Sequence, residues 1–168
     1  MTTVAYAAVT QSGLSFDRQL WMRPEIIPGL RRLTDAIHAE GAAAGIQLGH
    51  CGNMSHKSIC GCMPVGASSG FNLYSPTFVR GLRADELPEM ARAYGRSVNL
   101  AREAGFDSVE IHAGHGYLIS QFLSPSTNHR KDEFGGSLQN RMRFMDMVME
   151  EVMKAAGSDM AVLVKMNM

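Results

Sequence analysis

The chain of 168 residues carries 16 basic and 16 acidic side chains, so its formal net charge is zero, and 45% of its residues are hydrophobic. Balanced charge gives no electrostatic reason to expect nucleic acid or an anionic membrane as a partner. No apolar run is long enough to span a bilayer, and the amino terminus lacks the basic and hydrophobic regions of a signal peptide. We therefore expect a cytoplasmic protein with a sizeable buried core.

The cysteine content predicts no disulfide framework. Cys51, Cys60 and Cys62 form an odd set, and the short Cys-Gly-Cys run has neither the spacing of a zinc ribbon nor that of a ferredoxin cluster. We expect reduced thiols, as is usual inside cells. Metal binding by these cysteines is the alternative.

Segments with strand character alternate with segments of helical spacing along the whole chain. β-Branched and apolar residues predict a strand over 3–9, and Leu30, Leu33 and Ile37 predict a helix that ends at Gly41. The later elements expected are, in chain order, a strand over 44–48, a helix over 87–101, a strand over 107–112, a helix over 138–152 and a strand over 161–166. This order requires a parallel sheet with right-handed crossovers, and hence an α/β fold.

Residues 50–83 form a long stretch that is rich in Gly, Ser and Pro and has no clear periodicity. We expect it to be a loop that follows the strand over 44–48. A loop of this length inside a compact domain usually has a function, such as a lid or a wall of a binding site.

The strand over 107–112 leads directly into the most informative segment. Val109 and Ile111 are apolar, whereas the residues on the opposite face of this strand, among them Glu110 and His112, are polar. Gly114 and Gly116 then permit a sharp turn at the carboxyl end of the strand, which is where ligands bind in parallel-sheet proteins. We expect the side chains that follow this turn to lie beside His112.

Three sequence runs together resemble a known family: QLGHCGNMS (47–55), VEIHAGHGYLISQFLSP (109–125) and NHRKDEFGGSLQNRMRF (128–144). They are similar to the old yellow enzymes, in the branch of NADH:flavin oxidoreductases and ene-reductases. The resemblance covers nearly the whole chain and implies a TIM (β/α)8 barrel with FMN at the carboxyl ends of its strands. Such a barrel typically needs about 250 residues. We therefore expect a single domain over 1–168 that forms roughly half a barrel, with the second to fifth of the eight strands.

The resemblance also implies residues that contact the flavin. Gln47 aligns with a glutamine that binds the pyrimidine edge of the isoalloxazine ring, which suits an amide because it both donates and accepts. The alternative is a buried amide that satisfies loop backbone. Lys165 lies where many family members carry an arginine, and a cation there stabilises negative charge near N1 and O2 of reduced flavin. Lysine preserves the charge but loses the bidentate fork. His112 is expected to contact both flavin and substrate.

The same resemblance assigns His112, His115 and Tyr117 to catalysis. The histidine pair would hydrogen-bond the carbonyl oxygen of an activated alkene or quinone-like substrate, where negative charge accumulates as hydride arrives. Tyr117 would give a proton to the α-carbon. NADH or NADPH would be the reductant. For the histidines the alternatives are core packing or a zinc site, although the sequence places no third ligand; for Tyr117 the alternative is aromatic packing.

The charged run that includes Arg130 and Asp132 is interpreted as scaffold, with Ser137 as the N-cap of the following helix. In the family, the FMN phosphate is held by the last two strand-loop units, and no strand of this chain is followed by a convincing glycine-rich phosphate loop. Two further hypotheses therefore stand beside the enzyme: an inert fragment that self-associates as a homo-oligomer and so covers its exposed sheet edges, and a metal-dependent barrel enzyme.

Overall fold

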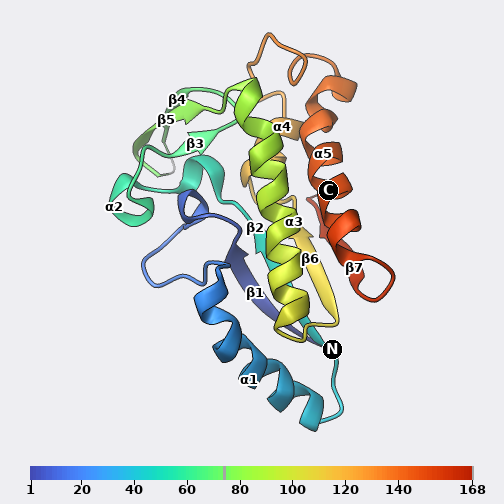
Figure 1. The fold of residues 1–168 in the computed structure, drawn as a ribbon. Helices are drawn as coiled ribbons and strands as arrows, with labels where there is room; N and C mark the ends of the chain where they lie inside the picture. The colour runs from blue at the N-terminus through green and yellow to red at the C-terminus, as the bar shows by residue number, and fades with distance from the viewer. Residues whose placement is uncertain (74, 168) are drawn as a thin grey trace.

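A four-stranded parallel sheet forms the centre of the computed structural model, which describes residues 1–73 and 75–167 (Figure 1). Its strand order is β1 (Thr2–Ala8), β2 (Ala44–Gly49), β6 (Ser108–His112) and β7 (Ala161–Lys165). All three pairings are parallel, as the alternation of strands and helices predicted. The sheet does not close on itself, because β1 and β7 are its two edges. The fold is therefore a partial (β/α) barrel, as expected.

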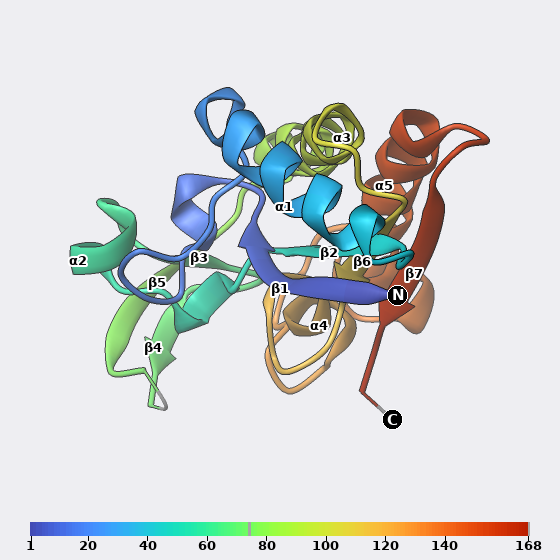
Figure 2. The same cartoon turned by 90° about the horizontal axis from the view of Figure 1, so that it is seen from below.

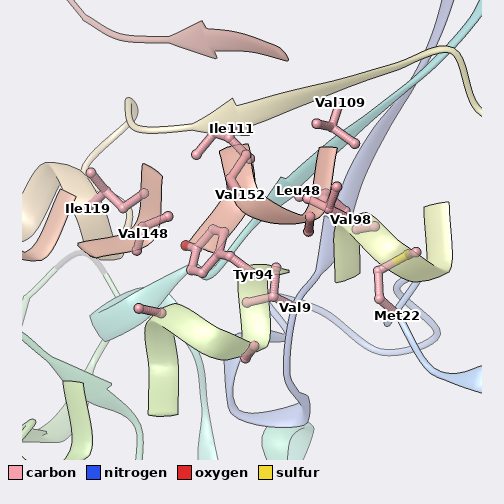
Figure 3. Close-up of a cluster of buried hydrophobic side chains, with 14 of the residues drawn as sticks. Val9, Met22, Leu48, Tyr94, Val98, Val109, Ile111, Ile119, Val148 and Val152 are labelled. Atoms are coloured by element: carbon pink, nitrogen blue, oxygen red, sulfur yellow. The ribbon is translucent and has the colours of Figure 1, made fainter. Parts of the chain in front are cut away.

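Three long helices cover one face of this sheet: α1 (Ile27–Ala39), α3 (Leu87–Glu103) and α5 (Leu138–Ala156) (Figure 2). Apolar residues of β2 and β6 face them, and Leu48, Ile111 and Val98 are fully buried in the resulting core (Figure 3). Burial of this apolar surface is the main force that holds the helices on the sheet. Among the described residues, no helix is long and apolar enough to cross a membrane.

Local sequence signals explain where the long helices begin and end. Pro28 and Pro88 occupy the first turns of α1 and α3, where a missing N–H costs nothing. Ser137 caps α5 as predicted, because its Oγ accepts a hydrogen bond of 3.2 Å from Asn140 N. Gly41 follows α1 with a φ of +71°, a conformation that suits glycine. Short 3-10 turns precede or connect these elements, at Gln11–Gly13, Pro24–Ile26, Gly52–Met54 and Ala84–Glu86.

The segment 50–83 is more ordered than the expected loop. It contains a short helix, α2 (Lys57–Cys60), and a small sheet of β3 (Val65–Gly66), β5 (Thr77–Gly81) and β4 (Gly70–Asn72), in that spatial order. Its strands are two to five residues long, which is too short for a visible alternation. A second short helix, α4 (Leu118–Leu123), follows β6 and was also not predicted.

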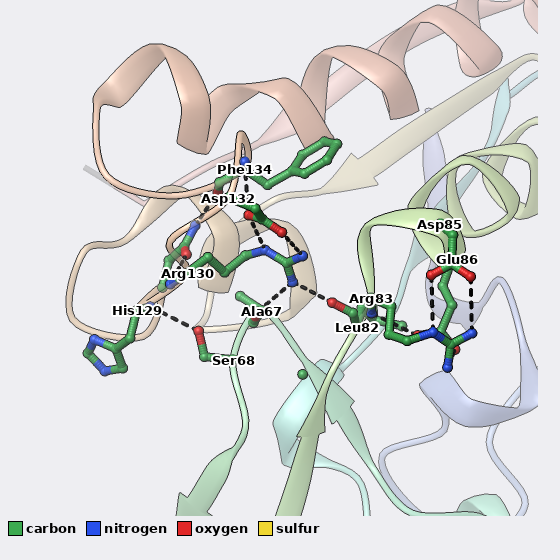
Figure 4. Close-up of polar contacts among 12 residues, drawn as sticks. Ala67, Ser68, Leu82, Arg83, Asp85, Glu86, His129, Arg130, Asp132 and Phe134 are labelled. Carbon is green, nitrogen blue, oxygen red and sulfur yellow. Dashed lines mark hydrogen bonds and ion pairs between the residues drawn. The ribbon is translucent and has the colours of Figure 1, made fainter.

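The charged run before α5 acts as scaffold, as interpreted from the sequence. The Arg130 side chain is only 8% exposed and pairs with Asp132 at 2.5 Å. It also donates hydrogen bonds to the carbonyls of Ala67, at 3.0 Å, and Leu82 (Figure 4). Arg130 thereby joins the loop before α5 to the carboxyl ends of the neighbouring strands β3 and β5.

Candidate active site

The polar residues at the carboxyl ends of the strands lie on the sheet face that points away from the long helices. In the strand register, Gln47 is opposite Glu110, and His112 is opposite Lys165. Side chains two residues apart on a strand share a face, so His112 lies on the same face as Glu110 and Gln47. The fold thus brings Gln47, His112 and Lys165 together from β2, β6 and β7.

Gly49 makes room for an aromatic residue that sequence reasoning missed. A Cβ at Gly49 would lie 2.6 Å from Tyr6 Cε2 and 3.0 Å from His112 Cβ. The Tyr6 ring therefore reaches across β2 towards His112, and its hydroxyl donates to Gly13 O at 2.8 Å. The pairing of β1 with β2 shifts register between Val4 and Ala7, so simple alternation along β1 could not place Tyr6 on this face.

His112 and His115 contact each other directly. His112 Nε2 and His115 Nδ1 are 3.1 Å apart, and the two rings are nearly perpendicular at a centroid distance of 4.8 Å. Gly114 N donates to His112 Nδ1 at 3.3 Å. Since Nδ1 is an acceptor in this network, we assign the proton of neutral His112 to Nε2, from which it is donated to His115.

Burial keeps His112 in its neutral form. The loss of hydration is the largest cause that lowers the pKa of His112, the neighbouring His115 and Lys165 lower it as well, and Glu110 opposes them, so that the pKa falls from 6.5 to about 4. At neutral pH, His112 is therefore a neutral hydrogen-bond donor rather than a cation.

Tyr117 completes an aromatic cluster with His112 and Tyr6. Its ring centroid is 4.8 Å from that of His112 and 5.3 Å from that of Tyr6. Tyr117 stands at the N-cap of α4, and its N–H donates to Gly114 O at 3.1 Å. The structure thus brings together all three residues assigned to catalysis, His112, His115 and Tyr117; their catalytic roles stay predictions.

The residues expected to contact the flavin differ in their burial and in their hydrogen bonds. Gln47 is 5% exposed, and its Nε2 donates to Glu110 Oε1 at 2.5 Å. An amide has two donor hydrogens and two acceptor lone pairs, so this single bond leaves capacity for a second polar partner. Lys165 is exposed beside His112. A buried amide, a neutral imidazole and a cation on one face of the sheet fit the polar edge of an isoalloxazine ring. The roles of Gln47, His112 and Lys165 towards flavin stay predictions.

Other supporting residues were not found from the sequence. Gln121 of α4 is 1% exposed and donates to Gly116 O at 2.6 Å and to Asn53 Oδ1 at 2.9 Å, which holds the turn before Tyr117 against the segment after β2. Asn167 Oδ1 accepts from His115 N at 3.2 Å, where His115 has a φ of +56°. A glutamine inside the apolar run LISQFL was the one available signal for Gln121.

The structure offers little support for a metal centre. Within residues 1–73 and 75–167, no group of three or more His, Cys, Asp or Glu side chains is placed to hold a metal ion. His112 and His115 thus make a pair without a third such ligand in that part of the chain. An open pocket of about 560 Å3 lies elsewhere, between the segment after β2 and α3, and Cys62, Arg80 and Met90 are among its lining residues.

The sequence matches a known family over its whole length. The model of the NADH:flavin oxidoreductase / NADH oxidase family matches residues 1–168. The chain is 42% identical over 168 residues to 4,4′-dithiodibutanoate disulfide reductase of Rhodococcus erythropolis, which covers 100% of this chain and 42% of that protein. It is 39% identical over 157 residues to the probable NADH-dependent flavin oxidoreductase YqiG of Bacillus subtilis, covering 93% of this chain and 42% of that protein.

Solved structures agree with the sequence matches. The old yellow enzyme homologue of Zymomonas mobilis superposes with a TM-score of 0.87 at 33% identity, over 94% of this chain and 48% of that one. Morphinone reductase in complex with tetrahydroNAD superposes with a TM-score of 0.89 at 28% identity, over 96% of this chain and 50% of that one. The chain thus spans half or less of the length of these relatives, in agreement with an open half-barrel. The solved relatives include an old yellow enzyme homologue. The motifs of the chain, its fold and these matches together show that the chain belongs to the NADH:flavin oxidoreductase / NADH oxidase family.

Proposed function

We propose that the chain forms the flavin-ring and substrate half of an FMN-dependent oxidoreductase that passes hydride from NADH or NADPH to an activated alkene or quinone-like acceptor. The observation that carries this proposal is the contact of His112, His115 and Tyr117 on the polar sheet face that also holds Gln47 and Lys165. FMN, when bound, would supply the two-electron chemistry. The protein side chains would bind, orient and move a proton.

The histidine pair is suited to hold a substrate oxygen. His112 is neutral and presents its Nε2 proton to His115. A carbonyl oxygen that enters between the two rings could accept from His112 Nε2 and, after a change of tautomer, from His115 Nδ1. Donors placed where negative charge develops stabilise the transition state, typically by about 3 to 4 kcal/mol per donor.

Tyr117 is the proposed proton donor. Its ring packs against His112, so its position relative to a substrate held by the histidines is set by the turn at Gly114 and Gly116. A phenol is a weak acid in water, and therefore transfers its proton only to a strongly basic carbon. Lys165 and Gln47 would hold the pyrimidine edge of the flavin, on the same face.

A disulfide is a second candidate substrate. The relative from Rhodococcus erythropolis is named for the reduction of a dialkyl disulfide. Reduction of a disulfide also consumes two electrons, so the same flavin could serve both reactions. Parallel assays of NADPH oxidation with 2-cyclohexenone and with 4,4′-dithiodibutanoate as acceptors would separate the two substrate classes.

The open sheet has two edge strands, β1 and β7. Among the described residues β7 pairs on one side only, and β1 pairs with β2 on one side and forms a single bridge, from Ala8 to Trp21, on the other. Val164 and Leu163 of β7 are 38% and 37% exposed. Unpaired strand edges bind other strands. We propose that further strands cover these edges in the working enzyme. An inert self-associating fragment, in which a second copy covers them, is the alternative, and analytical ultracentrifugation with and without FMN distinguishes the two.

The direct test is a flavin titration of the purified chain. We expect a shift of the visible FMN spectrum and quenching of its fluorescence, both weakened in Gln47→Leu and Lys165→Met. Lys154→Met is the matched control, since Lys154 is exposed on α5, which covers the face of the sheet opposite to the site (Figure 2). A chain that stays colourless after FMN addition and gel filtration refutes flavin binding by this half. Unchanged FMN binding in both site variants would refute the assigned residues.

A further inference from the structure

Cys60 and Cys62 form a close pair of thiols at the end of α2. Their Sγ atoms are 3.6 Å apart, and Cys60 Sγ also donates to the carbonyl of Cys62 at 3.1 Å. Only Gly61 separates them, with a φ of +74°, a left-handed conformation that glycine adopts without strain. This turn places both thiols on the same side of the chain. The cysteines that the sequence left without a role are thus preorganised as a pair.

The two thiols differ in their access to solvent. Cys60 is 2% exposed, whereas Cys62 is exposed and lines the open pocket of about 560 Å3. Burial and Cys60 raise the pKa of Cys62, and the charge of Arg80, which lines the same pocket, partly offsets this. Cys51, by contrast, is fully buried and donates to Leu14 O at 3.3 Å. Cys62 can therefore react with a molecule from solvent, Cys60 is buried next to it, and Cys51 is shielded from solvent.

We propose that Cys60 and Cys62 are a reversible dithiol–disulfide pair that exchanges with small-molecule disulfides entering the pocket beside Arg80. The Cys62 thiolate attacks one sulfur of R–S–S–R, breaks its S–S bond and releases one thiol. Cys60 then attacks the Cys62 sulfur of the mixed disulfide, releases the second thiol and closes the Cys60–Cys62 bond. In sum, two protein thiols are oxidised, one small disulfide is reduced to two thiols, and the two protons pass to them.

The geometry favours the second step. A disulfide needs its sulfurs about 2.0 Å apart, and the two thiols begin at 3.6 Å, so a small adjustment of the turn suffices. The turn lies between α2 and β3, outside the four-stranded sheet, so it can adjust without breaking a strand pairing of that sheet. An added thiol reverses the reaction. The proposal depends on neither flavin nor the His112 cluster, so it can succeed or fail independently of the proposed enzyme.

The experiment uses the reduced full chain and glutathione disulfide as the probe. Burial and the neighbouring Cys60 raise the pKa of Cys62, so the reaction is run at a mildly alkaline pH of about 8.5 to populate the thiolate. Remaining thiols are alkylated in denaturant, and the products are mapped by peptide mass spectrometry. We expect a Cys60–Cys62 disulfide, an alkylated Cys51, and recovery of three free thiols after addition of dithiothreitol.

Variants separate the two steps. Cys60→Ser should trap a stable glutathione adduct on Cys62, whereas Cys62→Ser should form little adduct because Cys60 is buried. Cys51→Ala is the matched control and should still form the pair. A wild-type chain that keeps three free thiols, or that accumulates the glutathione adduct as stably as Cys60→Ser, overturns the proposal. Circular dichroism checks the fold of each variant, and the mapping of the wild-type disulfide decides the question if Cys60→Ser does not fold.

Discussion

His112 Nε2 lies 3.1 Å from His115 Nδ1, so one neutral imidazole donates its proton to the other across the Gly114 turn. This arrangement links the two residues that the sequence assigned to a substrate oxygen. A substrate oxygen would therefore have to replace the hydrogen bond between His112 and His115, because the two rings do not already present two free donors.

Protonation of His112 should occur near pH 4. Its pKa is lowered by burial and by nearby positive charge, so the unfolded chain, with a histidine pKa of about 6.5, binds more protons between these values. The contribution of His112 to the free energy of unfolding is therefore fully present above about pH 6.5 and is lost as the pH drops towards 4. Nitrogen-15 NMR of the ring should show the Nε2–H tautomer down to pH 5. A midpoint near 6.5 would contradict this prediction.

Gly49→Ala should destabilise the fold. The added methyl group would meet the Tyr6 ring at 2.6 Å and His112 Cβ at 3.0 Å, and overpacking of this kind costs about 1 to 3 kcal/mol. Urea unfolding measures the change. Gly70→Ala is the matched control, since a Cβ there meets nothing within 4 Å; equal losses in both variants would show that the clash is not the cause.

Tyr94→Phe should leave stability unchanged or raise it by up to about 3 kcal/mol. Tyr94 is fully buried on α3, and within the described residues its hydroxyl has no hydrogen-bond partner (Figure 3). Removal of an unsatisfied buried hydroxyl relieves a penalty of about 1 to 3 kcal/mol, whereas loss of the whole ring in Tyr94→Ala should cost about 3 to 5 kcal/mol. Thermal unfolding compares the variants. A clear loss in Tyr94→Phe would reveal a hydroxyl contact.

Arg130→Met should weaken the link between the small sheet and the loop before α5. The substitution leaves Asp132 without its 2.5 Å partner and two carbonyls without a donor (Figure 4), at an expected cost of about 2 to 4 kcal/mol. Arg18→Met is the control, because the Arg18–Asp17 pair is more than 90% exposed and such pairs contribute little. Hydrogen exchange should localise the loss to β3 and β5; a global loss would contradict it.

Tyr117→Phe tests the proposed proton donor. In an enzyme that contains this half-barrel with its FMN, the phenyl ring should keep the packing against His112 and Tyr6 but remove the acidic proton. Alkene reduction should fall about 100- to 10,000-fold, while flavin reduction by NADPH, followed by stopped flow, should persist. Loss of both half-reactions would indicate a structural role instead.

The sequence by itself determined the order of the four strands of the main sheet and of the three long helices, the parallel sheet, and the two faces of β6. These features are local, because alternation at Val109, Glu110 and Ile111, the helical spacing of apolar residues and the cap at Ser137 each involve neighbours a few positions apart. The three motifs then pointed to the family and to His112, His115 and Tyr117, which the fold indeed places in contact.

Only the tertiary structure decided which distant residues meet. Tyr6 reaches His112 because β1 shifts register against β2 and Gly49 leaves space. Gln121 of α4 holds the turn before Tyr117, and the small sheet in 50–83 forms by pairing strands too short to carry a pattern. Contacts between segments that are far apart in sequence depend on packing and register over the whole molecule, and no local periodicity records them.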